Sequence, residues 1–176
     1  MAKHSHFRLA ALLAGALVAT GPAAAGDEVF FERIDGVWSG PGEIVAGKYK
    51  GTRFSCTLKG ESAGAKPGMT LDGTCRVGLF SQAISARVVR RGRSYGGQFL
   101  DGAGGKGLDV VSGNVSGDRV VLGMERAELS GAMVARVKPN GRLGVTVSVR
   151  VEDELVPVIG IDLERKLDGR AVGSVR

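Results

Sequence analysis

The sequence predicts an all-β protein, a single antiparallel up-and-down barrel of eight to ten strands, with a two-sheet β-sandwich as the second choice. Three observations lead to this fold. Segments of alternating apolar and polar residues follow one another to residue 166, short turn sequences separate them, and 29 glycines occur in strands as well as turns. Glycines within strands permit the sharp bends of a small barrel, and closure hides the edges of a long meander.

Residues 1–25 are expected to be a cleaved signal peptide. Lys3 and Arg8 give the segment a positive start, a run of small apolar residues follows, and an A-x-A cleavage site ends it. We therefore place processing between Ala25 and Gly26 and expect an exported protein, periplasmic or secreted. The apolar run is too short to span a bilayer, and no later stretch approaches the roughly 20 apolar residues of a membrane helix, so no transmembrane segment is expected.

The rest of the chain divides into one barrel domain, residues 26–166, and a polar tail, residues 167–176, which is expected to fray. Ahead of the first strand, Val29, Phe30 and Phe31 are expected to pack as an apolar staple across one barrel end. The alternative is a projecting segment that enters a partner protein. No helix is expected, apart from a single turn in "MERAELSG".

Alternation is cleanest in "LGVTVSVRV", where the odd-numbered residues from Leu143 to Val151 face one way. Asn140-Gly141 before it is a strong hairpin signal. In "ELVPVIGIDLER", the odd-numbered residues from Leu155 to Leu163 are likewise expected to share one face. The expected strands are residues 36–46, 49–60, 69–78, 83–91, 94–101, 107–115, 118–125, 131–138, 143–152 and 155–166.

Cys56 and Cys75 are the only cysteines, and an even number in an exported chain indicates a disulfide. Each lies in a strand-like segment, so the bridge is expected to join two antiparallel neighbours or their ends. The closed loop of about 20 residues predicts about 3 kcal/mol of stabilisation.

The residue types argue against an enzyme. Both histidines, His4 and His6, leave with the signal peptide, which removes histidine-activated nucleophiles and histidine metal sites. Three consecutive carboxylates, Glu152 to Glu154, are expected to form a solvated turn, because acid–base pairs are held apart across a cleft. The segment from Gly104 to Ser112 matches one copy of a calcium-binding repeat. We interpret it as a glycine loop entering a strand, since stacked copies are needed to hold the ion. No metal and no cofactor are expected.

Two sets of residues are candidates for binding. The first is expected to face the barrel interior, where it would hold a small apolar or amphipathic molecule unless the side chains fill the space themselves: Trp38, Val120, Leu122, Met133, Val145, Val147, Val149, Ile159 and Ile161. The second is a basic hairpin that would meet an anionic envelope component, its alternative being a solvated turn: Arg87, Arg90, Arg91 and Arg93. Lys48, Lys50 and Arg53 would lie beside this hairpin if the early hairpins share an end.

The formal net charge falls from +6 to +4 when Lys3 and Arg8 are removed, which leaves a mildly basic surface. Export argues against nucleic acid as the partner. Two function classes follow: a non-enzymatic binding module with a ligand in the barrel, and alternatively a protein-interaction module such as an envelope structural factor or a protease inhibitor.

Gly36-Val37-Trp38 resembles the G-x-W start of the first strand in lipocalins and their calycin relatives. The resemblance implies that the ring closes one barrel end and that an arginine of the last strand packs across it. Arg165 is placed for this contact, with Arg150 as the other candidate. Sequences such as "GLDVVSGNVSGDRVVLG" also resemble an uncharacterised family of exported proteins from Gram-negative bacteria, which implies no function. In outline the chain is similar to small periplasmic inhibitors of metalloproteases, although it is longer and its cysteine loop is wider.

Overall fold

One helix and ten strands make up the part of the chain that the structure describes, residues 22–100 and 107–166 of a computed structural model. Residues 1–21 of the predicted signal peptide, Gly104 to Lys106 of the glycine–aspartate motif and the predicted tail lie outside these ranges. The elements are α1 (Pro22–Glu32), β1 (Gly36–Ile44), β2 (Arg53–Ser62), β3 (Gly68–Val77), β4 (Phe80–Arg91), β5 (Ser94–Leu100), β6 (Leu108–Ser116), β7 (Arg119–Arg126), β8 (Leu129–Val137), β9 (Arg142–Val151) and β10 (Glu154–Arg165).

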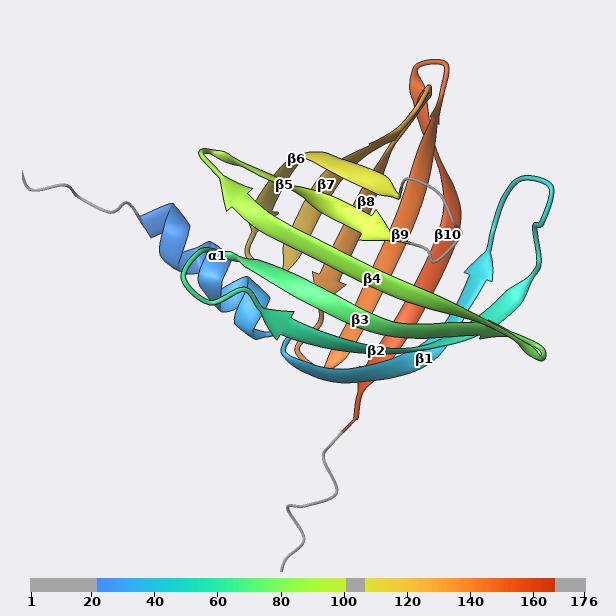
Figure 1. Cartoon of the computed structure of the whole chain (residues 1–176), viewed down its shortest axis with the longest axis horizontal. Coiled ribbons are helices and arrows are strands. Elements are labelled where there is room, and N and C mark those ends of the chain that lie inside the picture. The colour runs from blue at the N-terminus through green and yellow to red at the C-terminus, as the bar shows by residue number, and fades with distance from the viewer. Residues whose placement is uncertain (1–21, 101–106, 167–176) are drawn as a thin grey trace, which may run out of the picture.

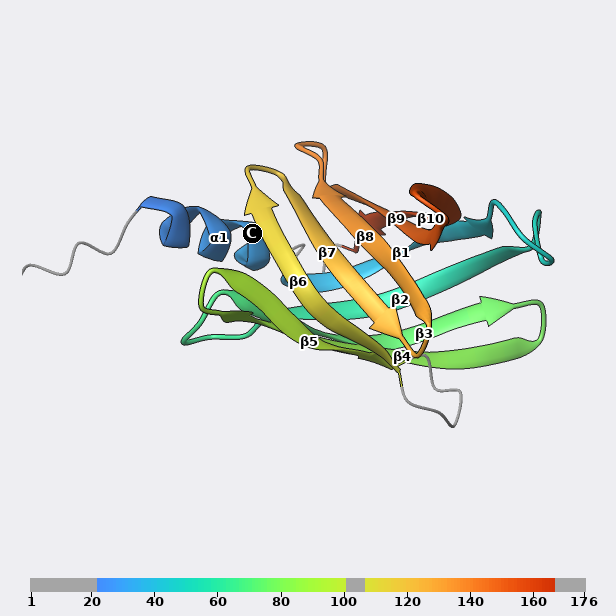
Figure 2. The ribbon, with the colours of Figure 1, turned by 90° about the horizontal axis from the view of Figure 1, so that it is seen from above.

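The strands form a closed antiparallel barrel in which each strand pairs with its neighbours in chain order and β1 pairs with β10 (Figure 1). The predicted up-and-down barrel is therefore confirmed. Because directions alternate, the connections fall at two ends. We call the end covered by α1 the closed end (Figure 2). The β1–β2, β3–β4, β7–β8 and β9–β10 connections lie at the other end, which we call the open end.

Two local expectations are wrong. The "MERAELSG" segment holds no helical turn: β7 ends at Arg126, β8 begins at Leu129, and Ala127 adopts a positive φ of 52° in the tight turn between them. In β10 a β-bulge interrupts the alternation, since Pro157 lies opposite Ser148 but Ile159 lies opposite Val147. The bulge inserts one residue, so Leu155 and Pro157 do not share the face of Ile159.

The β5–β6 ladder is the shortest among the described strands, with three register pairs. Beyond these pairs the Ser94 hydroxyl accepts a hydrogen bond from the Gly113 backbone N–H at 2.9 Å. A side chain on Gly113 would meet the Tyr95 Cβ at 2.8 Å, so the close approach of these two strands requires glycine there. A hydrogen bond to a serine side chain thus replaces part of the backbone hydrogen bonding between β5 and β6.

Helix α1 was not expected, and its pattern explains why it forms. Asp27, Phe30 and Phe31 follow the i, i+3, i+4 spacing of one helical face and are buried, and the buried Ile34 continues this spacing just beyond the end of the helix. Pro22 begins the helix, a position that tolerates a missing N–H. Phe30 and Phe31 pack across the closed end, as the staple hypothesis proposed, and do not project. The hypothesis is wrong for Val29, which is 55% exposed on the outer side of the helix.

Trp38 is fully buried at the closed end, where its indole N–H donates a hydrogen bond to the Ile34 carbonyl at 2.7 Å. The Arg165 guanidinium lies 4.4 Å from the centre of the ring, within the range of a cation–π interaction. It also donates to the carbonyls of Arg33 and Asp35. Gly36 has a φ of +117°, and a Cβ there would approach Arg165 Nη1 to 2.8 Å. Arg165, rather than Arg150, therefore joins the last strand to the first.

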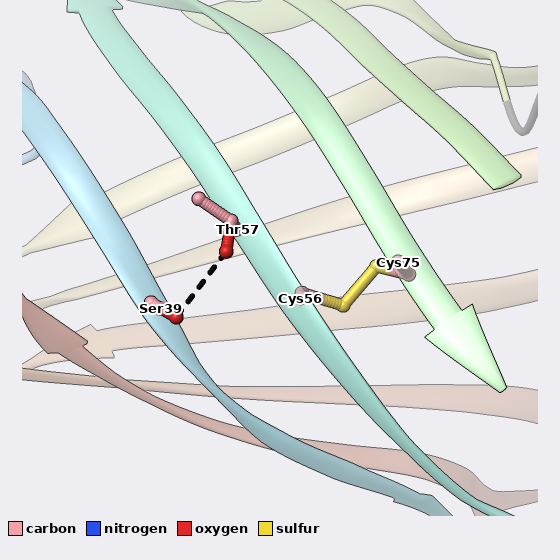
Figure 3. The surroundings of a disulfide bond; sticks show 4 residues. All are labelled: Ser39, Cys56, Thr57 and Cys75. Carbon is pink, nitrogen blue, oxygen red and sulfur yellow. Dashed lines mark hydrogen bonds between the residues drawn. A yellow bond between two sulfur atoms is a disulfide. The ribbon is translucent and has the colours of Figure 1, made fainter. Parts of the chain in front are cut away.

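Cys56 and Cys75 form the predicted disulfide, which joins directly opposed residues of β2 and β3 (Figure 3). The Cys56 side is buried at 1% exposure. The neighbouring residues Ser39 and Thr57 form a hydroxyl–hydroxyl hydrogen bond of 3.3 Å on the exposed face. The bridge thus ties two adjacent strands from inside the barrel.

Replacing both cysteines, Cys56→Ala with Cys75→Ala, is expected to lower the free energy of unfolding by about 3 kcal/mol, because the unfolded chain loses its loop constraint. Urea unfolding measures the change. The control is Ser39→Ala with Thr57→Ala on the exposed face, expected to stay within about 0.5 kcal/mol. Equal losses in both pairs would contradict a specific role for the bridge.

Phe30→Ala is expected to destabilise the protein by about 3 to 5 kcal/mol, since it empties a buried aromatic site at the closed end. Val29→Ala on the exposed side of the same helix is expected to change stability by less than about 0.5 kcal/mol. Thermal and urea unfolding of the two variants compare them directly. A Phe30→Ala protein as stable as the Val29→Ala protein would show that α1 does not close the barrel.

Candidate ligand cavity

An apolar cavity of about 470 Å³ lies inside the barrel, within the usual size range of small-molecule sites. Every strand except β1 contributes side chains, and Ile34, which follows α1, lines it from the closed end. Among the described residues that line it, only Ser81 and Gln82 are polar. Both belong to the first residues of β4, at the open end. The space therefore has an apolar interior and a polar margin on one side.

Cross-strand register explains how the wall is built. Val147 of β9 lies opposite Met133 of β8 and Ile159 of β10, which places three side chains in one row on the inner face. One step deeper, Val145 lies opposite Ala135 and Ile161. Each row turns its side chains toward the cavity.

Burial within the wall changes with depth. In the deepest row Leu143 and Leu163 are 3% and 1% exposed, packed beneath the cavity. Val145, Val147 and Ile159 face inward yet remain only half-buried, because no side chain fills the space in front of them. The open half of the barrel is thus hollow, whereas the closed half is a packed core.

Five of the nine interior residues expected from the sequence line this cavity: Met133, Val145, Val147, Ile159 and Ile161. Trp38, Val120 and Leu122 do not. Each is at most 1% exposed and belongs to the packed core rather than to the cavity wall. Val149 is half-buried and also lies outside the lining. The expected interior set therefore mixes cavity wall and closed-end core.

Residues of β2 and β3 form much of the wall but were absent from the expected set, including Phe54, Leu58, Met69 and Leu71. Their alternation with polar neighbours in "RFSCTLKG" and "GMTLDGTC" is a usable signal. The disulfide shows which residues of this alternation point inward. Cys75 itself lines the cavity, and residues two positions apart along a strand lie on the same face.

The basic hairpin candidates lie at the closed end, around the β4–β5 turn, not at the mouth of the cavity. Lys48, Lys50 and Arg53 belong to the β1–β2 connection and the start of β2, at the open end. The condition for the two basic groups to lie side by side, that their hairpins share an end, is not met, because the β1–β2 and β4–β5 connections fall at opposite ends of the barrel.

Arg90 is engaged in the fold rather than free for a ligand. Its guanidinium pairs with Asp27 of α1 at 2.9 Å, and the Tyr95 hydroxyl donates to the same carboxylate oxygen at 2.6 Å. Phe31 packs against the Tyr95 ring with centroids 5.4 Å apart. These contacts attach α1 to β4 and β5. Arg87, Arg91 and Arg93 are exposed, as a solvated turn would have them.

Burial, together with the hydrogen bond to Asp27 and its negative charge, raises the pKa of Tyr95 well above its ordinary value of 10.0. The folded protein consequently holds this proton at pH values where the unfolded chain releases it. The contribution of Tyr95 to the free energy of unfolding is therefore fully present below pH 10 and falls as the pH rises toward the higher pKa of the folded state.

Comparisons with known proteins bear on the fold. The sequence matches no protein-family model and no curated protein. The structure is similar to the crystal structure of Rv2717c from M. tuberculosis, with a TM-score of 0.57 and 16% sequence identity. The alignment covers 84% of this chain and 99% of that one. At this identity the likeness concerns the fold alone. Within the described ranges, no helix is long and apolar enough to cross a membrane.

Tyr95→Phe is expected to lower stability at neutral pH, because Asp27 loses a hydrogen-bond donor, and to flatten the alkaline decline. The difference in unfolding free energy between the original protein and the variant should shrink between about pH 9 and about pH 11, as the pH passes the ordinary tyrosine pKa of 10.0. Urea unfolding of both proteins at a series of pH values measures this difference. Lysines titrate in the same pH range, but they are the same in both proteins, so their effect cancels in the difference. A difference that stays constant across this range would contradict the raised pKa.

Proposed function

We propose that the protein is a non-enzymatic, exported binding module that holds one small apolar or amphipathic molecule in the barrel cavity. The observation that supports it most directly is the unfilled space of about 470 Å³ in front of half-buried inward-facing side chains. A packed barrel of this size would have filled that space with its own side chains. Apolar walls give water few hydrogen-bond partners, so an apolar occupant is favoured over solvent.

The distribution of polarity supports an amphipathic ligand with a defined orientation. The deep wall around Ile34 and Leu58 is apolar, and Ser81 and Gln82 lie only at the open margin. A ligand would therefore place its apolar part toward α1 and its polar part toward the mouth, where it keeps its hydration. The described lining contains no charged side chain, which favours an apolar body over a buried ionic group.

Two further observations are consistent with the proposal. The Cys56–Cys75 bridge is the kind of crosslink that persists in an exported protein. The segment expected to project into a partner protein in the alternative hypothesis is instead buried, with Phe30 and Phe31 each 1% exposed. The interaction-module alternative thereby loses one of the features that suggested it.

Val147→Trp tests the proposal because it places a large ring in the middle of the cavity wall. We expect at least a tenfold weaker affinity for a fluorescent apolar probe such as N-phenyl-1-naphthylamine, which brightens on leaving water. Titration of the purified protein with the probe measures binding, and a melting curve establishes that the variant is folded.

The matched control is Val111→Trp, which adds the same ring at an exposed position of β6 and should leave affinity unchanged. If the original protein does not take up the probe, or if the two tryptophan variants bind it equally, the cavity is not a ligand site. Because overpacking can destabilise a core, a folded Val147→Arg variant serves as a second test of the same position.

A further inference from the structure

Exposed apolar side chains gather at the open end of the barrel. Of the eleven large hydrophobic residues that are exposed in the described part of the chain, Val29 lies on α1 and Val111 in the middle of β6. The other nine lie at the open end, in the connections or in the adjoining strand ends: Val45, Tyr49, Val77, Leu79, Phe80, Leu100, Leu129, Val151 and Leu155. Scattered single exposures are ordinary, but a group of this kind indicates an interaction surface.

The β3–β4 tip is the most exposed part of this group. Val77 pairs with Phe80, so Gly78 and Leu79 form a two-residue turn, with Gly78 at a φ of +57°. The exposed fraction is 101% for Leu79 and 83% for Phe80. The hairpin projects beyond the barrel wall next to the β1–β2 connection, as both views show (Figures 1 and 2). That connection contributes Tyr49, which is 63% exposed.

Basic side chains flank these apolar residues. Lys48 and Lys50 adjoin Tyr49, Arg53 begins β2, and Arg76 lies opposite Ser55 in the β2–β3 ladder, one residue before Val77. All four are exposed. Arg53 lies 3.7 Å from Glu43, an exposed ion pair that solvent screens. Leu79, Phe80 and Tyr49 together with these four basic residues are called the tip patch below.

We propose that the tip patch docks onto an anionic lipid bilayer surface. Leucine and aromatic side chains enter the boundary between headgroups and acyl chains, while long basic side chains reach the phosphates beside them. Anionic headgroups attract such a basic cluster, and salt weakens the attraction. Phe80 also lines the cavity, so docking places the mouth of the cavity against the bilayer. The docking itself does not need a ligand, whereas exchange of a ligand with the bilayer rests on the proposed function.

Charge argues against a second copy of the chain as the occupant. A two-fold symmetric contact would set the four basic side chains of the tip patch against the same four of the partner. The acidic turn of Glu152 and Asp153 cannot neutralise them within the chain, since it ends the β9–β10 hairpin, which projects in a different direction from the β3–β4 tip (Figure 1). The acidic hairpin is expected to stay away from the bilayer, so the barrel docks on one side of its mouth.

Co-sedimentation with vesicles tests the proposal. Vesicles of phosphatidylcholine and phosphatidylglycerol in equal parts should bind the protein, and vesicles of phosphatidylcholine alone should bind it at least tenfold more weakly. Leu79→Asp with Phe80→Asp should reduce binding to the anionic vesicles at least tenfold. Val29→Asp with Val111→Asp is the matched control, because it removes two exposed apolar side chains and adds the same charge elsewhere. It should bind much as the original protein does.

Lys48→Gln with Lys50→Gln tests the electrostatic part and should lower binding to anionic vesicles toward the level of neutral ones. The proposal is overturned if the original protein fails to sediment with anionic vesicles, or if the matched control loses as much binding as the tip variant. It is also overturned if sedimentation analysis shows a dimer that only the tip variant abolishes, which would assign the patch to a second copy. Val147→Trp should leave vesicle binding intact, so failure of the cavity and failure of docking are distinguishable.

Discussion

The fold depends on one closure, in which the last strand returns to the first and is held there by Arg165 over the Trp38 ring. Without it the meander would present two long unpaired edges, β1 and β10, to solvent and to other chains. The same guanidinium donates to the backbone between α1 and β1, so strand closure and helix placement share one side chain. Asp27, Arg90 and Tyr95 attach the far side of the helix to the middle of the chain. The contacts that close the barrel and attach the helix therefore gather at the closed end.

This asymmetry divides the interior into a packed half and a hollow half. Aromatic rings fill the closed end, and the rows of branched side chains above them become less crowded toward the mouth. A cavity costs stability because its lining side chains lack packing partners. The apolar side chains buried under the helix and in the closed-end core offset this cost. The exposed apolar side chains at the open end lie around the mouth of the cavity. A bilayer bound there would therefore face the opening through which a ligand would pass.

Sequence patterns predicted the ten strands within a few residues, since period-two alternation and turn residues are local signals. They also predicted the disulfide and the inward direction of Met133 and Val145. The β10 bulge was missed although Pro157 beside it is a signal, since proline has no N–H for the ladder and within sheets lies at edges or bulges. The apolar Val158 hid the extra residue by keeping the pattern continuous. Whether Val147 faces a cavity or a neighbour depends on the barrel's width, which follows from the shear of all ten strands together. Helix α1 was missed because its first residues also read as the end of a signal peptide.

The short β5–β6 ladder has a consequence for how the wall fluctuates. A barrel opens first where its backbone pairing is sparsest, and three register pairs with a serine hydroxyl beside them form the weakest seam among the described ladders. Parting there would convert the cylinder into a curved open sheet while β1 and β10 stay together. Strands β1 and β10 would then move as one body and the break would fall between β5 and β6, giving the lumen a slow lateral exit distinct from its mouth.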